Sequence, residues 1–486
     1  MMTVIAPRRQ RRRPLPGFSR EQLPFLIILL PFGLYLEVID EVLHPILHPD
    51  AFAYLWEGPL TRWYFLGRSL SLRLLYSLAG NAPETIIRLQ LLVFLLSTLA
   101  LYHCLRYRRW WADLLLATGL AYLFSSYDLT LIAVVVAPEA WAIGIGLLCA
   151  ALCFAPPGRG RTVLTLITGI ALIFSRNLGP FVMLMLLVCH YALGWRRDWR
   201  QPLWLGATLL VIALTSMVLT QCFDRTVHVN TLNNLYTRVF PSADHTRLFV
   251  TDYGMPDGPF IDACRGSVNT PCMNGETMLD MDPERRSYRL RDDPHGLGHW
   301  VQTHGARAYQ RFLLVDRPGW TLWTFQQQFP IFHRAGLAYP RAYFSGLPQA
   351  HDPLALLARE GWGGEAGFLG HDPLLGLCTP MAYLGFHGLA TLSAWLALGA
   401  LLAWYGPGRT RRLSLALALL ASGAGQFFLG FFGDGMEIAR HVFPATVTLS
   451  LGTVLMLVAL PEALRRGRTG RRGTLVALFP AAPLLH

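Results

Sequence analysis

Stretches of apolar residues alternate with short polar segments along most of this chain. About 20 apolar residues are enough to cross the hydrocarbon core of a bilayer as a helix. The pattern therefore predicts an all-α polytopic membrane protein with about ten or eleven transmembrane helices. The apolar stretches lie near residues 24–40, 86–105, 111–126, 136–155, 162–175, 179–194, 203–222, 380–404, 413–432 and 442–460, with a shorter one at 473–485.

Runs of arginine occupy alternate gaps between these stretches and set the predicted orientation. Loops on the cytoplasmic side of a membrane carry an excess of basic residues, so we place these gaps and the amino terminus in the cytoplasm of a bacterium, with the protein in its inner membrane. A cleaved signal peptide is the alternative interpretation of the first stretch, but no small-x-small cleavage site follows it. The runs lie at 8–13, 106–109, 159–161, 196–200, 409–412 and 465–472.

The composition agrees with a membrane protein and narrows the chemistry. Hydrophobic residues make up 53% of the chain, charged residues only 15%, and the mean hydropathy is +0.37. Apart from histidine, all 42 basic residues are arginines, so no lysine is available for a Schiff base or as a nucleophile. The arginines flank apolar stretches, so the net charge of +12 reflects the orientation of the helices in the membrane and contact with lipid headgroups. We therefore expect no nucleic-acid partner.

Two segments on the predicted exterior side are too long to be turns, and they divide the chain. Residues 1–222 are expected to form an amino-terminal transmembrane bundle with a first periplasmic loop at 41–85. Residues 223–379 are polar and have enough length for a periplasmic insert domain. Residues 380–486 carry the last transmembrane helices.

The first loop contains a pattern typical of a helix that lies in the headgroup plane. Large apolar residues recur there at helical spacing, while Arg73 and other arginines lie off the stripe. One amphipathic helix over 60–78 is the structure this pattern predicts. The stripe consists of Trp63, Leu66, Leu70, Leu74 and Leu78.

Aromatic residues in the insert recur at partly helical intervals between 299 and 318. Such residues near a membrane-face cavity are suited to holding an acceptor sugar. The alternative is that they form the small core of the insert itself, which is the commoner case. The residues concerned are Trp300, Tyr309, Phe312 and Leu313.

Carboxylates gather where the first apolar stretch ends. Asp40 and Glu41 lie at its exit, and Asp50 follows in the first exterior loop, four residues before Tyr54. Acidic groups at a membrane face are candidates for proton transfer or for binding a substrate. Asp50 is also a good helix N-cap, and Asp40 and Glu41 are equally suited to solvating a helix end.

A second group of charges precedes the last predicted helix. Asp434, Glu437, Arg440 and His441 stand together in Gly433-Asp434-Gly435-Met436-Glu437-Ile438-Ala439-Arg440-His441. Arginine binds phosphate oxygens through two N–H groups at any pH, and histidine adds a donor, so Arg440 and His441 are candidates for binding a phosphate. A set of rim charges that pair with one another is the alternative.

Two further charges lie at exterior ends of predicted helices. Arg176 stands on the side that the distribution of the other arginines disfavours, which suggests a ligand for a phosphate. Glu139 follows Pro138 at the start of a helix, where a carboxylate stabilises the helix dipole and has no other necessary role.

Cysteine usage is consistent with an oxidising exterior. Cys264 and Cys272 are close in sequence within the insert, while Cys222 and Cys378 lie at its two junctions with the membrane. Both a local disulfide and one that closes the whole insert are therefore plausible. No cysteine or histidine spacing matches a structural zinc site.

The combination of features resembles the GT-C glycosyltransferases, which use polyprenyl-phosphate sugars as donors. That family combines a many-spanned bundle, a catalytic carboxylate in the first exterior loop, an amphipathic helix after it and a large exterior insert. Its first loop often reads Pro-Asp-Glu with a Tyr shortly after, and Pro49-Asp50-Ala51 with Tyr54 departs from this only at Ala51. The resemblance implies a GT-C-like fold with Asp50 as base. Because the Glu is missing, a divalent metal is compatible with the motif but not implied by it.

The chemistry of sugar transfer assigns roles to the same residues. Transfer from a phosphate with inversion needs a carboxylate to remove the proton of the acceptor, and Asp50 is the first candidate, with Asp40 and Glu41 next. The departing phosphate needs positive charge, which Arg440 would supply. The remaining candidate ligands hold that arginine or bind the sugar or phosphate; they are His441, Glu437, Asp434, Arg176, Glu139 and Tyr54.

The expected partners are the lipid bilayer, a polyprenyl-phosphate sugar donor, and a glycan, lipid or protein acceptor. Two other classes of protein remain open. A glycan polymerase or ligase would share the large exterior loop and exterior arginines without needing the first-loop aspartate. A transporter or flippase for lipid-linked saccharides would carry ionisable residues in the middle of its helices, whereas those of this chain cluster at helix ends.

Overall fold

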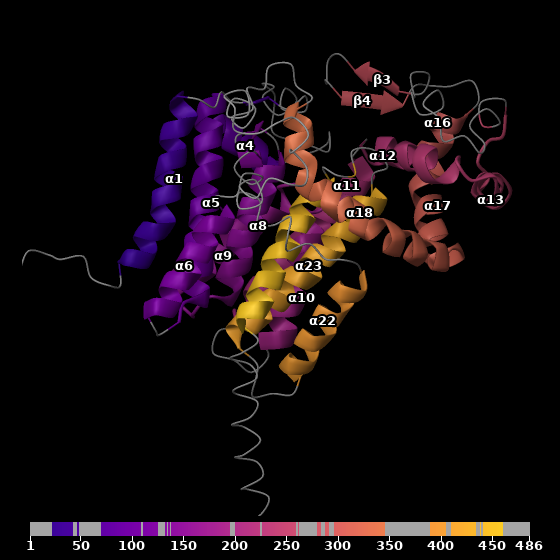
Figure 1. The fold of residues 1–486 in the computed structure, drawn as a ribbon. Helices are drawn as coiled ribbons and strands as arrows, with labels where there is room; N and C mark the ends of the chain where they lie inside the picture. The colour runs from indigo at the N-terminus through magenta and orange to yellow at the C-terminus, as the bar shows by residue number, and fades with distance from the viewer. Residues whose placement is uncertain are drawn as a thin grey trace, which may run out of the picture.

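A computed structural model shows a bundle of helices with a smaller helical cluster at one end (Figure 1). It describes residues 22–41, 46–47, 70–107, 110–124, 132–133, 135–136, 138–194, 200–223, 226–258, 261, 279–282, 287–290, 296–345, 389–404, 410–433, 438 and 441–459.

Every apolar stretch of the sequence that the structure describes is a helix, and these helices make up the bundle. A helix satisfies all its interior backbone N–H and C=O groups within itself, so it is the structure that an apolar stretch adopts in lipid. The helices are α1 (Leu23–Glu41), α5 (Pro83–Leu105), α6 (Trp110–Phe124), α8 (Pro138–Phe154), α9 (Arg159–Ile173), α10 (Gly179–Gly194), α11 (Leu203–Phe223), α22 (Leu389–Trp404), α23 (Arg411–Gly433) and a final helix, His441–Ala459.

Four of the described helices are long and apolar enough to cross a membrane on their own. They are Pro83–Leu105, Leu203–Thr220, Arg411–Gly433 and His441–Ala459. Other helices of the bundle are apolar but shorter, among them Pro138–Phe154. The protein is therefore a helical candidate multi-pass membrane protein. The larger number of spans stays a prediction, and its last stretch, 473–485, lies outside the described residues.

Small residues allow α23 and the final helix to approach closely. A Cβ on Gly423 would lie 2.8 Å from Leu449 Cγ and 3.1 Å from its backbone nitrogen. A Cβ on Gly452 would likewise lie 3.0 Å from the backbone nitrogen of Leu420. Helices in lipid associate by such close packing because apolar side chains gain little from leaving lipid for protein. This contact fixes the final helix against the bundle.

The helices and strands between α11 and α22 are here called the insert cluster, and they pack against α22 and α23 of the bundle. The end of the bundle that lies next to this cluster is called the insert end, and α8 begins and α9 and α23 end there (Figure 1). The opposite end of the bundle is called the arginine end. The cluster consists of α12 (Thr226–Asn234), the π-helix η1 (Leu235–Val239), α13 (Ala243–Tyr253), an antiparallel pair of strands, β3 (Leu279–Asp282) and β4 (Ser287–Leu290), then α16 (Leu297–Trp300), η2 (Val301–Gly305), α17 (Ala306–Arg311), η3 (Phe312–Asp316) and α18 (Pro318–Ser345).

The aromatic residues of the insert form its own core. The ring of Phe312 is fully buried and lies 5.3 Å from the ring of Phe249 and 5.3 Å from that of Trp320. Trp300 and Tyr309 are buried with it. Because these side chains are buried and pack against one another, they are core residues, as the commoner interpretation expects.

The predicted first exterior loop is described only at residues 41, 46–47 and 70–85, and its helix is α4 (Leu70–Leu78). The predicted helix is confirmed over that range, and Leu74 and Leu78 are exposed, as a stripe that faces lipid would be. Arg73 departs from the prediction. It is buried and its Nη1 donates to Asn81 Oδ1 at 2.8 Å, because α4 packs a second face, with Leu72 and Tyr76, into the bundle.

Substitution of Gly423 tests the close packing of α23. Gly423→Ala should lower the stability of the protein by about 1–3 kcal/mol, because the added methyl group overlaps Leu449. The matched control is Gly119→Ala on α6, where nothing lies within 4 Å of the added Cβ. Alanine is the better helix former, so the control should melt at the same temperature or higher. Equal melting of the two variants by tryptophan fluorescence would contradict the packing.

Acidification should loosen the insert cluster through His245 on α13. Burial against the rings of Phe312 and Trp320 lowers the pKa of His245 below its usual 6.5. The neutral form therefore stabilises the fold above pH 6.5, and this contribution is lost as the pH falls through the lowered pKa. Hydrogen exchange of α13, corrected for its intrinsic pH dependence, should accelerate below pH 6.5. His245→Asn, which does not titrate, should remove the effect, and an unchanged profile would refute the assignment.

Candidate functional site

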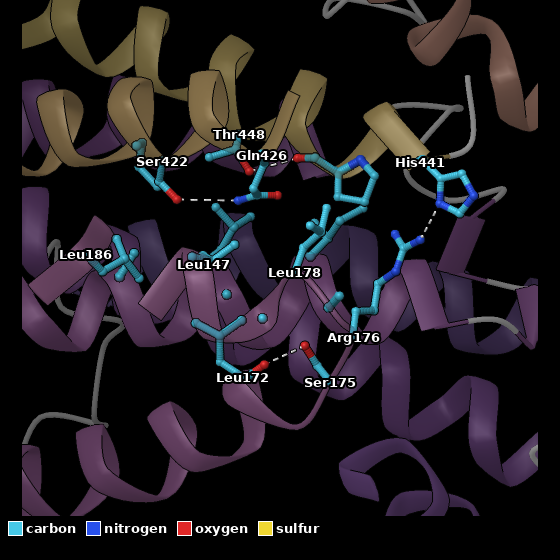
Figure 2. A pocket seen from close by; sticks show the side chains of 18 residues that line it. Leu147, Leu172, Ser175, Arg176, Leu178, Leu186, Ser422, Gln426, His441 and Thr448 are labelled. Atoms are coloured by element: carbon cyan, nitrogen blue, oxygen red, sulfur yellow. Dashed lines mark hydrogen bonds between the residues drawn. The ribbon is translucent and has the colours of Figure 1, made fainter. Parts of the chain in front are cut away.

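Three side chains from distant parts of the sequence meet at the insert end of the bundle. Arg176 Nη2 lies 3.2 Å from Glu139 Oε1 and 3.0 Å from His441 Nδ1. Figure 2 shows Arg176 reaching across to His441 at the start of the final helix. Glu139, Arg176 and His441 were each predicted separately as candidate ligands, and the structure brings the three together.

Local sequence places each of these groups at a helix end. Pro138 begins α8 and puts Glu139 in its first turn, where a carboxylate interacts favourably with the helix dipole. Arg176 lies in the turn between α9 and α10, which is closed by the Ser175 hydroxyl donating to the Leu172 carbonyl at 2.7 Å. That turn requires Gly179, because a Cβ there would overlap the carbonyl oxygen of Leu172.

The ion pair is largely buried, so its charges have lost most of their contact with water. The Glu139 side chain is 1% exposed and that of Arg176 is 14% exposed. An ionised carboxylate removed from water needs an opposite charge and hydrogen bonds to compensate for lost hydration. Within the described part of the chain, both polar contacts of Arg176 use Nη2. Because arginine has five N–H donors, those on Nε and Nη1 remain for an acceptor from outside.

His441 is held in one orientation and one tautomer. Arginine can only donate, so Nδ1 of His441 accepts, and the proton of the neutral ring lies on Nε2. The start of the final helix passes close to α23 at Gly430, where a Cβ would lie 3.0 Å from the His441 carbonyl oxygen. A small residue at position 430 therefore positions His441 beside Arg176.

A narrow crevice runs from this group into the bundle (Figure 2). Arg176 and His441 stand at its mouth, and Ser422, Gln426 and Thr448 line it farther in, among apolar side chains of α8, α10 and α23. Its volume of about 30 Å³ has room for about two water molecules. The crevice thus has a mostly apolar lining with a few polar groups and a cation at its opening, and it is too small for a sugar.

Parts of the predicted first exterior loop are bonded to the same end of the bundle. The Ser71 N–H donates to the Phe174 carbonyl at 3.1 Å, and Trp141 Nε1 donates to the Ser71 hydroxyl at 3.0 Å. Earlier in the same loop, strand β1 (Ile46–Leu47) pairs in parallel with β2 (Val135–Val136), with Leu47 opposite Val136. The loop therefore has one anchor on each side of residues 48–69, next to α8 and to the α9–α10 turn.

Other predicted site residues are described incompletely or not at all. Asp40 and Glu41 form the last residues of α1, and Cys222 lies near the end of α11, but their side chains are not among those described. Outside the described residues lie Asp50, Tyr54, Asp434, Glu437, Arg440, Cys264, Cys272 and Cys378.

Sequence analysis did not identify the polar lining of the crevice. Its polar residues stand within or beside apolar stretches, where single polar residues are common. They could be found from sequence only by asking which polar residues share the inward face of their helices. These residues are Ser175, Ser422, Gln426 and Thr448. Among the described residues, no three His, Cys, Asp or Glu side chains gather as a metal site would require.

No protein-family model, curated protein or solved structure matches this chain. The contacts within the molecule are therefore the basis for any functional assignment.

A double-mutant cycle should measure the coupling between Glu139 and Arg176. Glu139→Ala leaves Arg176 without its buried counter-charge and should cost about 3–5 kcal/mol of stability. Adding Arg176→Met should recover part of that loss, because no unpaired charge then remains. Denaturant titration in detergent gives the coupling energy.

The exposed pair Arg247–Asp244 serves as the control, since its charged atoms lie 2.8 Å apart with side chains 73% and 77% exposed. Asp244→Ala should cost no more than about 1 kcal/mol. If the losses of unfolding free energy in the two single variants add up to the loss in the double variant, the buried pair is not coupled.

Proposed function

We propose that this protein is a GT-C-type membrane glycosyltransferase. It transfers a sugar from a polyprenyl-phosphate donor to a glycan, lipid-linked or protein acceptor. The observation that carries the proposal is the group at the crevice mouth. There Arg176 is held by Glu139 and His441 through Nη2, while its Nε and Nη1 donors are directed to no acceptor within the described residues.

A prearranged arginine suits the departing phosphate of such a donor. When the bond from the sugar to the phosphate breaks, negative charge grows on the phosphate oxygens, and a fixed cation stabilises it without rearrangement. Arginine does this through two parallel N–H groups. Arg440 directly precedes His441 in the sequence, so a second guanidinium is attached to the same helix start. In this proposal both arginines serve the donor phosphate.

Asp50 supplies the base, and the strand pairing supports this role. Asp50 follows Leu47 by three residues, and Glu139 follows Val136 by three residues, while Leu47 and Val136 are paired. Three residues of chain reach at most about 11 Å. In this proposal Asp50 lies on the same side of the bundle as the end of α8 that carries Glu139. A carboxylate there removes the proton of the acceptor hydroxyl as the sugar leaves the phosphate.

The size of the crevice indicates where the substrates lie. The crevice has room for about two water molecules and none for a sugar, so in this proposal the sugar and acceptor meet above its mouth. The polyprenyl chain remains in the bilayer beside the helices. With the arginine end in the cytoplasm, as the basic gaps predict, the reaction takes place on the periplasmic face of a bacterial inner membrane.

Transfer assays with radiolabelled polyprenyl-phosphate sugars test the proposal. Asp50→Asn keeps the size of the side chain but cannot accept a proton, so transfer should fall by about 10²–10⁴-fold while donor binding is retained. Arg176→Ala should weaken donor binding. Arg176→Lys should not restore it, because a point charge cannot reproduce two parallel N–H groups.

Arg247→Ala on α13 is the control, since this exposed arginine lies away from the crevice and should leave transfer unchanged. Gel filtration confirms that each variant is folded. If the folded parent protein shows neither transfer nor slow hydrolysis of any donor in the panel, the glycosyltransferase assignment is wrong, and the polymerase or transport class replaces it.

A further inference from the structure

Four large apolar side chains are exposed where η3 turns into α18. Leu314 and Val315 precede the turn and are 64% and 66% exposed, and Leu322 and Trp323 follow it, each 60% exposed. We call these four residues the apolar tip. Their neighbours Phe312 and Leu313 are buried in the insert cluster. The turn thus separates residues that pack inside from residues that face outward.

The tip is held rigidly by contacts across the turn. Thr321 donates from its hydroxyl to the Leu313 carbonyl at 2.8 Å, which ties the start of α18 to η3. Asp316 Oδ2 accepts from the Tyr253 hydroxyl at 2.5 Å and from Arg311 Nε at 3.0 Å, which ties the turn to α13 and α17. Because these bonds fix both sides of the turn, the exposed residues are a built feature of the surface.

The position of α18 places the tip beside the bundle. The ring of Phe325 lies 5.9 Å from that of Phe427 and 5.2 Å from that of Phe428, near the end of α23. The helix also contacts α22, which begins at Leu389. Figure 1 shows the turn between α17 and α18 descending from the insert cluster to the level at which α22 begins. The tip therefore lies beside the insert-end part of the bundle, next to α22 and α23.

We propose that the apolar tip is inserted into the interfacial region of the leaflet at the insert end. A patch of four large apolar side chains costs free energy in water, and this cost is removed when the patch enters lipid. Tryptophan is the residue best suited to that depth, because its ring is amphipathic. Arg317 at the turn adds a positive charge for phosphate headgroups, while Asp316 is paired with Arg311.

Insertion would add a contact with lipid to the contacts that already hold the insert cluster on the bundle. Those contacts include the packing of α18 on α23. The added contact would help to set the height and tilt of the cluster at the insert end. Insertion of the tip into lipid does not depend on whether the protein transfers a sugar.

Spin labels at the tip test the insertion in the full-length protein. The variants Leu322→Cys and Trp323→Cys are each labelled with a nitroxide and reconstituted in phospholipid nanodiscs. The spectrum of the labelled parent protein is subtracted to remove the signal from labels on the native cysteines. Oxygen concentrates in lipid, while a nickel chelate stays in water. The ratio of oxygen to nickel accessibility should be several-fold higher at both sites than at Arg247→Cys on α13, which is exposed in the insert cluster.

Two results would overturn the inference. Nickel accessibility at 322 and 323 equal to that at 247 would place the tip in water. Low accessibility to both reagents would show that protein covers it, as in an association of two copies. Should either substitution prevent folding, Val315→Cys provides the same measurement at an exposed site on the other side of the turn.

Discussion

A carboxylate buried in an apolar bundle is the constraint on which the insert end depends. Glu139 is 1% exposed, and an ion in that position is stable only with a cation and hydrogen bonds at the correct distance. Arg176 provides the cation and His441 accepts from the same guanidinium nitrogen. Three helix ends, those of α8, α9 and the final helix, must therefore meet in one arrangement. Arg176 and His441 of this group also line the crevice.

The same need to satisfy buried polar groups organises the arginine end. Gln201 donates from its backbone N–H to His190 Nε2 at 2.9 Å and from its side chain to Thr165 Oγ1 at 3.0 Å. Arg412 donates from Nε to the Leu105 carbonyl at 2.7 Å and so caps the end of α5. Carbonyl groups at helix ends have no partner within the helix, so such bonds replace water where water is scarce. Both ends of the bundle are thus fixed by specific bonds, and apolar packing fills the space between them.

The insert cluster is joined to the bundle by a buried arginine. Arg238 of η1 donates to the Phe431 carbonyl near the end of α23 and lies 4.6 Å over the Phe431 ring. It also donates to Asn234 Oδ1, and Asn234 in turn donates to the Gly433 carbonyl at 3.2 Å. The end of α23 is therefore held by the insert cluster on one side and by the final helix on the other. The insert cluster therefore fixes the position at which α23 ends.

Much of the architecture follows from sequence, because a helix in lipid needs only local backbone bonds and an apolar surface. The stretch predicted at 179–194 is the helix Gly179–Gly194. Sequence also marked Glu139, Arg176 and His441, since each is a charged or titratable group at a helix end. Only the tertiary structure decided that these three meet, because Arg176 and His441 are 265 residues apart and no local pattern encodes that contact. The burial of Arg73 has the same origin: which face of a short helix turns inward is set by its neighbours, and its own spacing cannot determine it.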